Sequence, residues 1–253
     1  MSELAARAPG RLATALRTSR VPGASLIAAA LAFAAAWFLM PCAGETDAAE
    51  IFRIVTPVRG AVLAAAVLRL LAATLYGPAM VGIIRDRDAR LAGRLWRPAA
   101  VLLVGTLGLA AAALDHMLAY AMTAAGVDQA AQVDVMEWMQ GPGLLIIAPL
   151  IACYFAGAAW LAVAYARAGV VSRWNPALYL GALAIAIGGA VLGQLTDVID
   201  GRTVGILTMW AVAAPQLWLG CVLWRTGQRW ERGPGPVRAR GPGSTATPLH
   251  HIS

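Results

Sequence analysis

Six long stretches of apolar residues, separated by short polar segments, constrain this chain more than any other feature of its sequence. They span roughly residues 22–41, 58–84, 98–122, 143–166, 177–197 and 203–224. Each is long enough for a helix to cross the hydrocarbon core of a bilayer, which needs about 20 mainly apolar residues. Alanine and leucine dominate these stretches and favour helix, and they lack the alternation of a membrane β-barrel. The sequence therefore predicts an all-α polytopic membrane protein with a six-helix bundle.

The placement of arginine predicts the orientation of these spans. Lysine is absent, and most of the 20 arginines lie in the terminal segments and in the second and fourth connections, whereas most of the 13 acidic residues lie in the other connections. Cytoplasmic loops are enriched in positive charge, so we expect both termini on the cytoplasmic side of a cell membrane. The net charge of +7 then reflects topology and attraction to anionic lipid headgroups. Nucleic acid is not an expected partner.

The chain divides into three parts by composition. Residues 1–21 are basic and interrupted by Pro9-Gly10, which is typical of an amphipathic segment on the inner membrane surface. Residues 22–225 form the predicted membrane domain. Residues 226–253 are rich in glycine and proline and lack apolar periodicity, so a disordered cytoplasmic tail is expected there.

Two of the outer connections contain helix signals. Asp47 followed by Glu50 is typical of a helix that begins with an aspartate cap and has an acid in its first turn. Residues 127–140 resemble an amphipathic helix on the outer surface, and Gly141-Pro142-Gly143 is expected to end it. This second helix could cap a cavity, or it could serve only as an interfacial connector.

Two charged residues, Arg69 and Asp115, lie inside predicted spans. At 1.5 Å per residue, Arg69 is about 14 Å and Asp115 about 10 Å from the outer ends of their spans. Small residues flank both of them, and ridges of small residues mark close helix contacts, so both charges should face the bundle interior. We expect an Arg69–Asp115 ion pair, which would be either functional or a purely structural device that sets the register of two helices.

His116 is the histidine that falls within a predicted span, and Tyr120 follows it by one turn. A histidine can donate one hydrogen bond and accept another, so a His–Tyr or His–Asp proton relay is possible. A histidine simply bonded to a neighbouring helix is the plainer alternative. Further polar residues within the spans complete the candidate binding set. The full set for substrate or ion binding is Arg69, Asp115, His116, Tyr120, Gln194, Thr208 and Gln216.

Several familiar chemistries have no counterpart in the sequence. It contains no HExxH, GxSxG, Walker or CxxC motif. One histidine cannot provide a bis-histidine haem site, and no other ligand stands at metal-binding spacing beside it. No metal and no cofactor are therefore expected. Cys42, Cys153 and Cys221 are expected to be free structural thiols.

Three classes of function remain open. The protein could bind or transport a small molecule or protons through an outward-facing polar pocket, which is the reading we favour. With six spans, a complete pathway would call for a homo-oligomer or a partner membrane subunit in addition to the lipid bilayer. It could instead be a metal-independent enzyme in which Asp115 and His116 perform acid–base chemistry on a lipid-soluble substrate such as an isoprenoid. The third class is a non-catalytic subunit or scaffold.

Overall fold

The computed structural model describes residues 20–42, 45, 47–85, 89–124, 126, 128–195 and 201–231, and all regular structure within them is helical. In chain order the elements are α2 (Val21–Leu39), α3 (Ala48–Val55), the 3-10 turn η1 (Thr56–Val58), α4 (Arg59–Ile84), α5 (Ala89–Met122), α6 (Gln129–Trp138), the π turn η2 (Met139–Gly143), α7 (Leu144–Arg167), α8 (Trp174–Leu195) and α9 (Gly201–Glu231). The predicted all-α class is confirmed.

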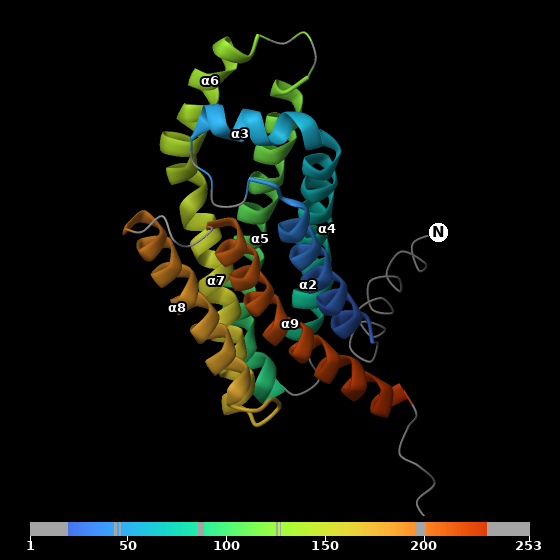
Figure 1. Ribbon diagram of the computed structural model, residues 1–253. Coiled ribbons are helices and arrows are strands. Elements are labelled where there is room, and N and C mark those ends of the chain that lie inside the picture. Colours follow the sequence, from blue (N-terminus) through green and yellow to red (C-terminus); the bar gives the residue numbers. More distant parts are fainter. Residues whose placement is uncertain are drawn as a thin grey trace, which may run out of the picture.

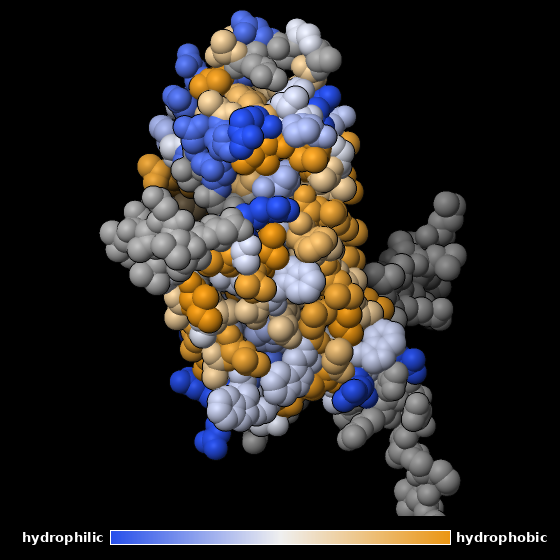
Figure 2. All heavy atoms as spheres, viewed as in Figure 1, coloured by the Kyte–Doolittle hydropathy of each residue, from blue (hydrophilic) through white to orange (hydrophobic). Residues whose placement is uncertain are grey.

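The long helices have the length and composition of membrane spans. Five described helical stretches meet these criteria, namely Val21–Leu39, Ala48–Ile84, Gly93–Met122, Ala130–Arg167 and Arg202–Gly227. The mostly apolar α8, with 22 residues, is a sixth helix of sufficient length. Large apolar side chains such as Leu107, Leu145 and Ile185 are more than half exposed, and Figure 2 shows a hydrophobic belt along the flank with polar residues near the α3/α6 end. This is the architecture of a membrane-embedded helical protein.

The six long helices lie side by side in one bundle (Figure 1), and their contacts close into a ring. Helix α2 packs between α4 and α9, α4 continues to α5, and α5 packs on α7, while α8 joins α7 to α9. One core cluster fills the ring and includes Phe33, Tyr76 and Tyr154. A second cluster, with Phe52 and Met136, lies where α3 and α6 meet the ends of the longer helices. The ring thus has a distinct α3/α6 end.

Glycines bring α5 and α7 into backbone contact. A Cβ atom on Gly105 would lie 2.2 Å from the backbone nitrogen of Tyr154, and one on Gly157 would lie 2.4 Å from that of Leu102. The two helices therefore approach through reciprocal glycine notches, as expected for small-residue ridges in membrane helices. This contact sets the rotation of α5 about its axis.

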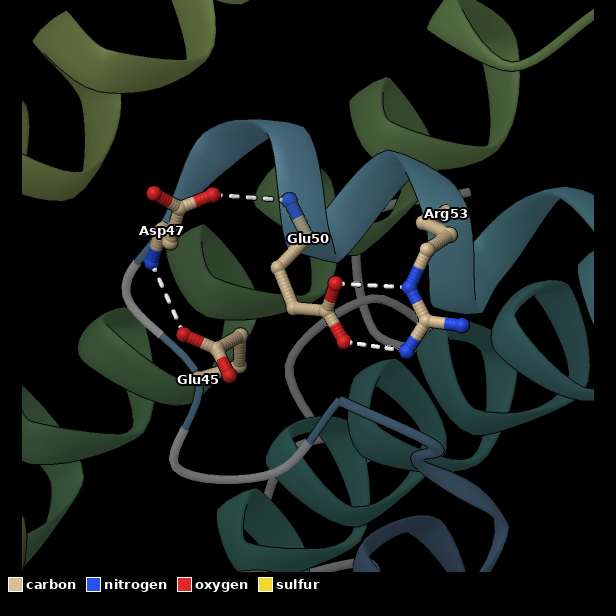
Figure 3. Close-up of polar contacts among 4 residues, drawn as sticks. All are labelled: Glu45, Asp47, Glu50 and Arg53. Carbon is tan, nitrogen blue, oxygen red and sulfur yellow. Dashed lines mark hydrogen bonds and ion pairs between the residues drawn. The ribbon is translucent and has the colours of Figure 1, made fainter.

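Helix α3 lies across the end of the bundle (Figure 1), and its start agrees with the sequence prediction. The Asp47 side chain accepts a hydrogen bond of 2.8 Å from the Glu50 backbone nitrogen, which satisfies a donor that the first helical turn leaves unpaired. The Glu50 carboxylate in turn pairs with the Arg53 guanidinium, one turn later (Figure 3). The Glu45 carboxylate accepts from the Asp47 backbone nitrogen at 3.0 Å.

The predicted break at residues 141–143 is wrong. The chain runs from α6 through the π turn η2 into α7 without leaving helical conformation. Pro142 has no N–H to donate, and its ring excludes the carbonyl four residues earlier. Widening the turn to π spacing relieves that clash while the helix continues. The amphipathic cap and the fourth span are thus one continuous helical rod that contains a π turn.

Two helices extend beyond their predicted bounds. Helix α5 begins at Ala89 instead of near residue 98, with Pro98 inside it. Helix α9 ends at Glu231, within the segment expected to form the tail. Arginine and glutamine are good helix formers, so loss of hydrophobicity in residues 225–231 does not end the helix. The basic N-terminal segment up to residue 19 and the expected disorder of residues 232–253 lie outside the described residues.

Candidate functional site

A cavity of about 140 Å³ lies beneath α3 and α6, where α2, α4 and α5 come together. An apolar cavity of about 150 Å³ engineered into a soluble protein holds benzene, so this volume suits a ligand of about six non-hydrogen atoms. Its wall combines charged, amide, sulfur and apolar side chains. These are Trp37, Met40, Cys42, Glu45, Ile51, Arg69, Asp115, His116, Ala119, Met136 and Gln140. Three of the seven predicted binding residues, Arg69, Asp115 and His116, therefore share one cavity.

Arg69 is a cation deep within the packed helices. Its side chain is only 5% exposed, and it reaches the cavity from the middle of α4. Nη1 lies 3.2 Å from Nδ1 of His116, and the guanidinium carbon lies 4.8 Å from the centroid of the Trp37 ring. Arg69 thus connects α2, α4 and α5 through a cation–π contact and one hydrogen bond.

The bond to Arg69 defines the charge state of His116. A guanidinium has donors and no acceptor, so the ring nitrogen that faces Arg69 has to accept, and His116 is neutral in this arrangement. Protonation of that nitrogen would break the bond and place a second cation beside the first. His116 is buried, so this change would occur where water screens charge poorly. The pair is therefore a proton-sensitive link between α4 and α5.

The expected Arg69–Asp115 ion pair is wrong. Within the part of the chain that the structure describes, the Asp115 carboxylate has no hydrogen bond and no ion pair within 4.0 Å. Successive residues of a helix point about 100° apart, and the rotation of α5 aims His116 at Arg69 while Asp115 lines the cavity. Asp115 is half-buried, so the cavity contains a carboxylate near a guanidinium without direct contact between them.

The remaining polar wall residues were not predicted from the sequence. Trp37 ends an apolar span, where an aromatic residue is usually read as an interfacial anchor. Gln140 is the last residue of the predicted cap helix, and its amide nitrogen is 3.8 Å from the Met136 sulfur. Glu45 comes from the connection before α3. Burial raises the pKa of the Cys42 thiol to about 11, so this thiol remains protonated at neutral pH.

Tyr120 lies beside the cavity and does not form the relay considered for it. The guanidinium of Arg59 stacks on the Tyr120 ring, with 4.4 Å from its central carbon to the ring centroid. The same guanidinium donates to the Tyr120 backbone carbonyl at 2.9 Å. The structure gives no hydrogen bond between the described side chains of Tyr120 and His116. Tyr120 therefore joins the start of α4 to the end of α5.

Gln216 belongs to a separate buried cluster inside the helix ring. Its amide nitrogen donates to the Tyr154 hydroxyl at 3.0 Å, and the Tyr76 hydroxyl lies 2.8 Å from that of Tyr154 and donates to the Gln216 carbonyl oxygen. Nearby, Asn175 donates to the Pro215 carbonyl at 2.8 Å. The cluster joins α4, α7 and α9, and it could not be found from the sequence because its members come from distant spans.

Of the other two predicted residues, Thr208 is not part of the cavity wall. Thr208 is buried in α9, and its hydroxyl has no hydrogen-bond partner among the described residues. The side chain of Gln194 lies outside the described part of the chain. No group of three histidine, cysteine or acidic residues among those described could hold a metal ion. All three cysteines are free thiols.

Comparison of the chain with protein-family models found no matching family, and comparison with curated proteins and with solved structures found no match. The geometry of the cavity is therefore the basis for inferring a function.

Proposed function

We propose that this protein binds a small polar solute in the cavity beneath α3 and α6, as the binding step of proton-coupled transport. The observation that carries the proposal is the convergence of Arg69, Asp115 and His116 on one cavity inside apolar helices. Ionisable groups at membrane depth are costly and commonly mark a solute or ion pathway. If these residues had a purely structural role, each would be expected to bond to another protein group. Asp115 instead faces the cavity without a partner among the described residues.

The distribution of charge supports an outward-facing cavity. Acidic residues such as Asp47, Glu50 and Asp134 belong to the segments at the α3/α6 end. The helix ends opposite to α3 and α6 carry arginines instead. These are Arg20, Arg85, Arg94, Arg97, Arg167, Arg173 and Arg225. With positive charge retained in the cytoplasm, the chain is a six-span protein of the cell membrane with both termini cytoplasmic.

Proton coupling follows from the chemistry of His116 and Asp115. Proton uptake by His116 breaks its bond to Arg69 and frees the guanidinium to bind a solute. Asp115 can hold a second proton when the cavity is empty and release it when a cation approaches. The Tyr76–Tyr154–Gln216 cluster closes the ring on the cytoplasmic side of this site. A pathway past it is completed by movement of the helices or by a second subunit.

Solute-driven proton flux tests this proposal. Purified protein is reconstituted into vesicles that contain the pH dye pyranine, and L-alanine, L-lactate or L-alaninamide is added outside. These three molecules have nearly the same shape and differ in charge. At least one of them should change the internal pH faster than in protein-free vesicles. Asp115→Asn should abolish the difference, and the matched control Asp134→Asn, an exposed acid of α6, should preserve it.

Folding of each variant is checked by size-exclusion chromatography and thermal unfolding before the flux is measured. Equal flux with and without protein for all three solutes would overturn the proposal, and so would full flux in a folded Asp115→Asn variant. His116→Gln provides a second test at the same site. It should reduce the pH dependence of the flux to the part that Asp115 contributes, because glutamine takes up no proton at this position.

A further inference from the structure

We propose that the ligand of this cavity is a small zwitterion, with a carboxylate that binds Arg69 and an ammonium group that binds Asp115. The inference rests on the proposed function and identifies the class of solute for the same site. It is carried by two opposite charges that line one cavity without contacting each other.

Arg69 has unused capacity to bind an anion. A guanidinium offers five N–H donors in a planar fork that matches a carboxylate. Among the described residues, its hydrogen bonds go to His116 alone, through Nη1. The ring of Trp37 holds the guanidinium without consuming a hydrogen bond. Arg69 is therefore both oriented and largely unsatisfied.

Asp115 provides the complementary charge. Its carboxylate lines the same cavity, and no donor in the described part of the chain bonds to it. Glu45, a second carboxylate of the wall, places additional negative charge around the space. A ligand that is only an anion would face two carboxylates, and a ligand that is only a cation would face the guanidinium. A molecule with both charges satisfies the two sides through charge-assisted hydrogen bonds.

The size of the cavity and the apolar part of its wall narrow the class of ligand further. About six non-hydrogen atoms fit the volume of about 140 Å³, which is the size of the smallest α-amino acids. Met40, Ile51 and Ala119 supply apolar surface on the same wall, and this surface suits a short aliphatic side chain. Alanine has the required charges and size. Larger aromatic or strongly charged amino acids exceed the volume or add an unmatched charge.

Equilibrium binding to the wild-type protein in lipid nanodiscs tests the charge requirement. Calorimetric titrations at neutral pH compare L-alanine with L-lactate, which lacks the ammonium group, and with L-alaninamide, which lacks the carboxylate. Alanine should bind about tenfold to a hundredfold more tightly than either, because each analogue loses one charge-assisted interaction. Equal or tighter binding of lactate or alaninamide would overturn the inference.

Variants assign each charge to its residue. Asp115→Asn should weaken the binding of alanine and alaninamide by about tenfold or more and leave the affinity for lactate nearly unchanged. Arg69→Gln should weaken the binding of alanine and of lactate. Asp134→Asn is the control and should change none of these affinities. If Arg69→Gln does not fold, the test is the ratio of alanine affinity to lactate affinity in Asp115→Asn and in the wild type. An unchanged ratio would refute the assignment of the ammonium group to Asp115. If lactate drives flux and alanine does not bind, the proposal of a zwitterionic ligand is refuted, whereas the proposal of proton-coupled transport is retained. If no solute binds or drives flux, both proposals fail.

Discussion

Replacing Gly105 with alanine tests the reasoning about how α5 and α7 pack. The added Cβ would lie 2.2 Å from the Tyr154 nitrogen and 2.3 Å from its Cα, whereas ordinary contacts begin near 3.4 Å. The obstruction is backbone, so it cannot rotate away as a side chain could. The two helices therefore have to separate by about 1 Å, a gap that removes a quarter to a half of the attraction between contacting atoms.

The expected cost follows from this separation. Overpacking of this kind destabilises proteins by about 1–3 kcal/mol, and a loss of about 2 kcal/mol lowers the melting temperature of a chain of this size by about 4–8 °C. Thermal unfolding in detergent, followed by tryptophan fluorescence, measures the shift. The control is Gly181→Ala in α8, where an added Cβ meets nothing within 4 Å. This control should be neutral or slightly stabilising.

The reciprocal notch makes the test sharper. An added Cβ on Gly157 would also meet backbone, 2.4 Å from the Leu102 nitrogen, so Gly157→Ala opens the same interface. The double variant Gly105→Ala/Gly157→Ala should then lose less stability than the sum of the two single losses, because one separation accommodates both methyl groups. A Gly105→Ala protein as stable as Gly181→Ala, or two fully additive losses, would refute this account of the interface.

Three further predictions follow from other parts of the structure. Burial raises the pKa of Cys42 to about 11. In a variant with the other cysteines replaced by alanine, the rate of iodoacetamide labelling should therefore rise about tenfold per pH unit from pH 7 to 9. A plateau of this rate near pH 9, measured by mass spectrometry, would contradict the prediction. Tyr76→Phe loses buried hydrogen bonds to Tyr154 and Gln216 and should cost about 1–3 kcal/mol. Tyr179→Phe removes a hydroxyl that has no hydrogen-bond partner among the described residues and should cost nothing, so equal melting temperatures would contradict this contrast. Asp47→Ala removes the cap of α3 and should speed hydrogen exchange there about fivefold, from a loss of about 1 kcal/mol; unchanged exchange would show that the cap contributes little.

The sequence was sufficient to locate most helices because length and apolar composition define membrane spans with little help from tertiary contacts. The Asp47 cap was also predictable, since both partners lie within one turn. The partner of Arg69 was not predictable. The choice between Asp115 and His116 depends on the rotation of α5, which backbone contact through Gly105 sets in three dimensions. A pattern of small residues indicates that helices meet and leaves their rotation open.

The prediction that a helix ends at residues 141–143 was wrong for a local reason. Glycine and proline usually mark the end of a helix, but a π turn can carry a helix past a proline at the cost of one widened turn. The Trp37–Arg69 contact was missed because it joins two spans that the sequence treats separately. Such contacts depend on which helices become neighbours, and the apolar pattern of each helix contains no record of that.

Because helix is continuous from α6 through η2 into α7, a tilt at one end of this segment is transmitted to the other end. Met136 contributes to the wall of the cavity, and Tyr154, on the same rod, takes part in the buried hydrogen-bond cluster. The two residues are separated by roughly 27 Å of helix at 1.5 Å per residue, so a small tilt near Tyr154 is amplified at the far end. The π turn between these two residues departs from α-helical hydrogen-bond spacing, and kinks in helices concentrate at such turns, so bending of the rod is expected there, close to the cavity wall.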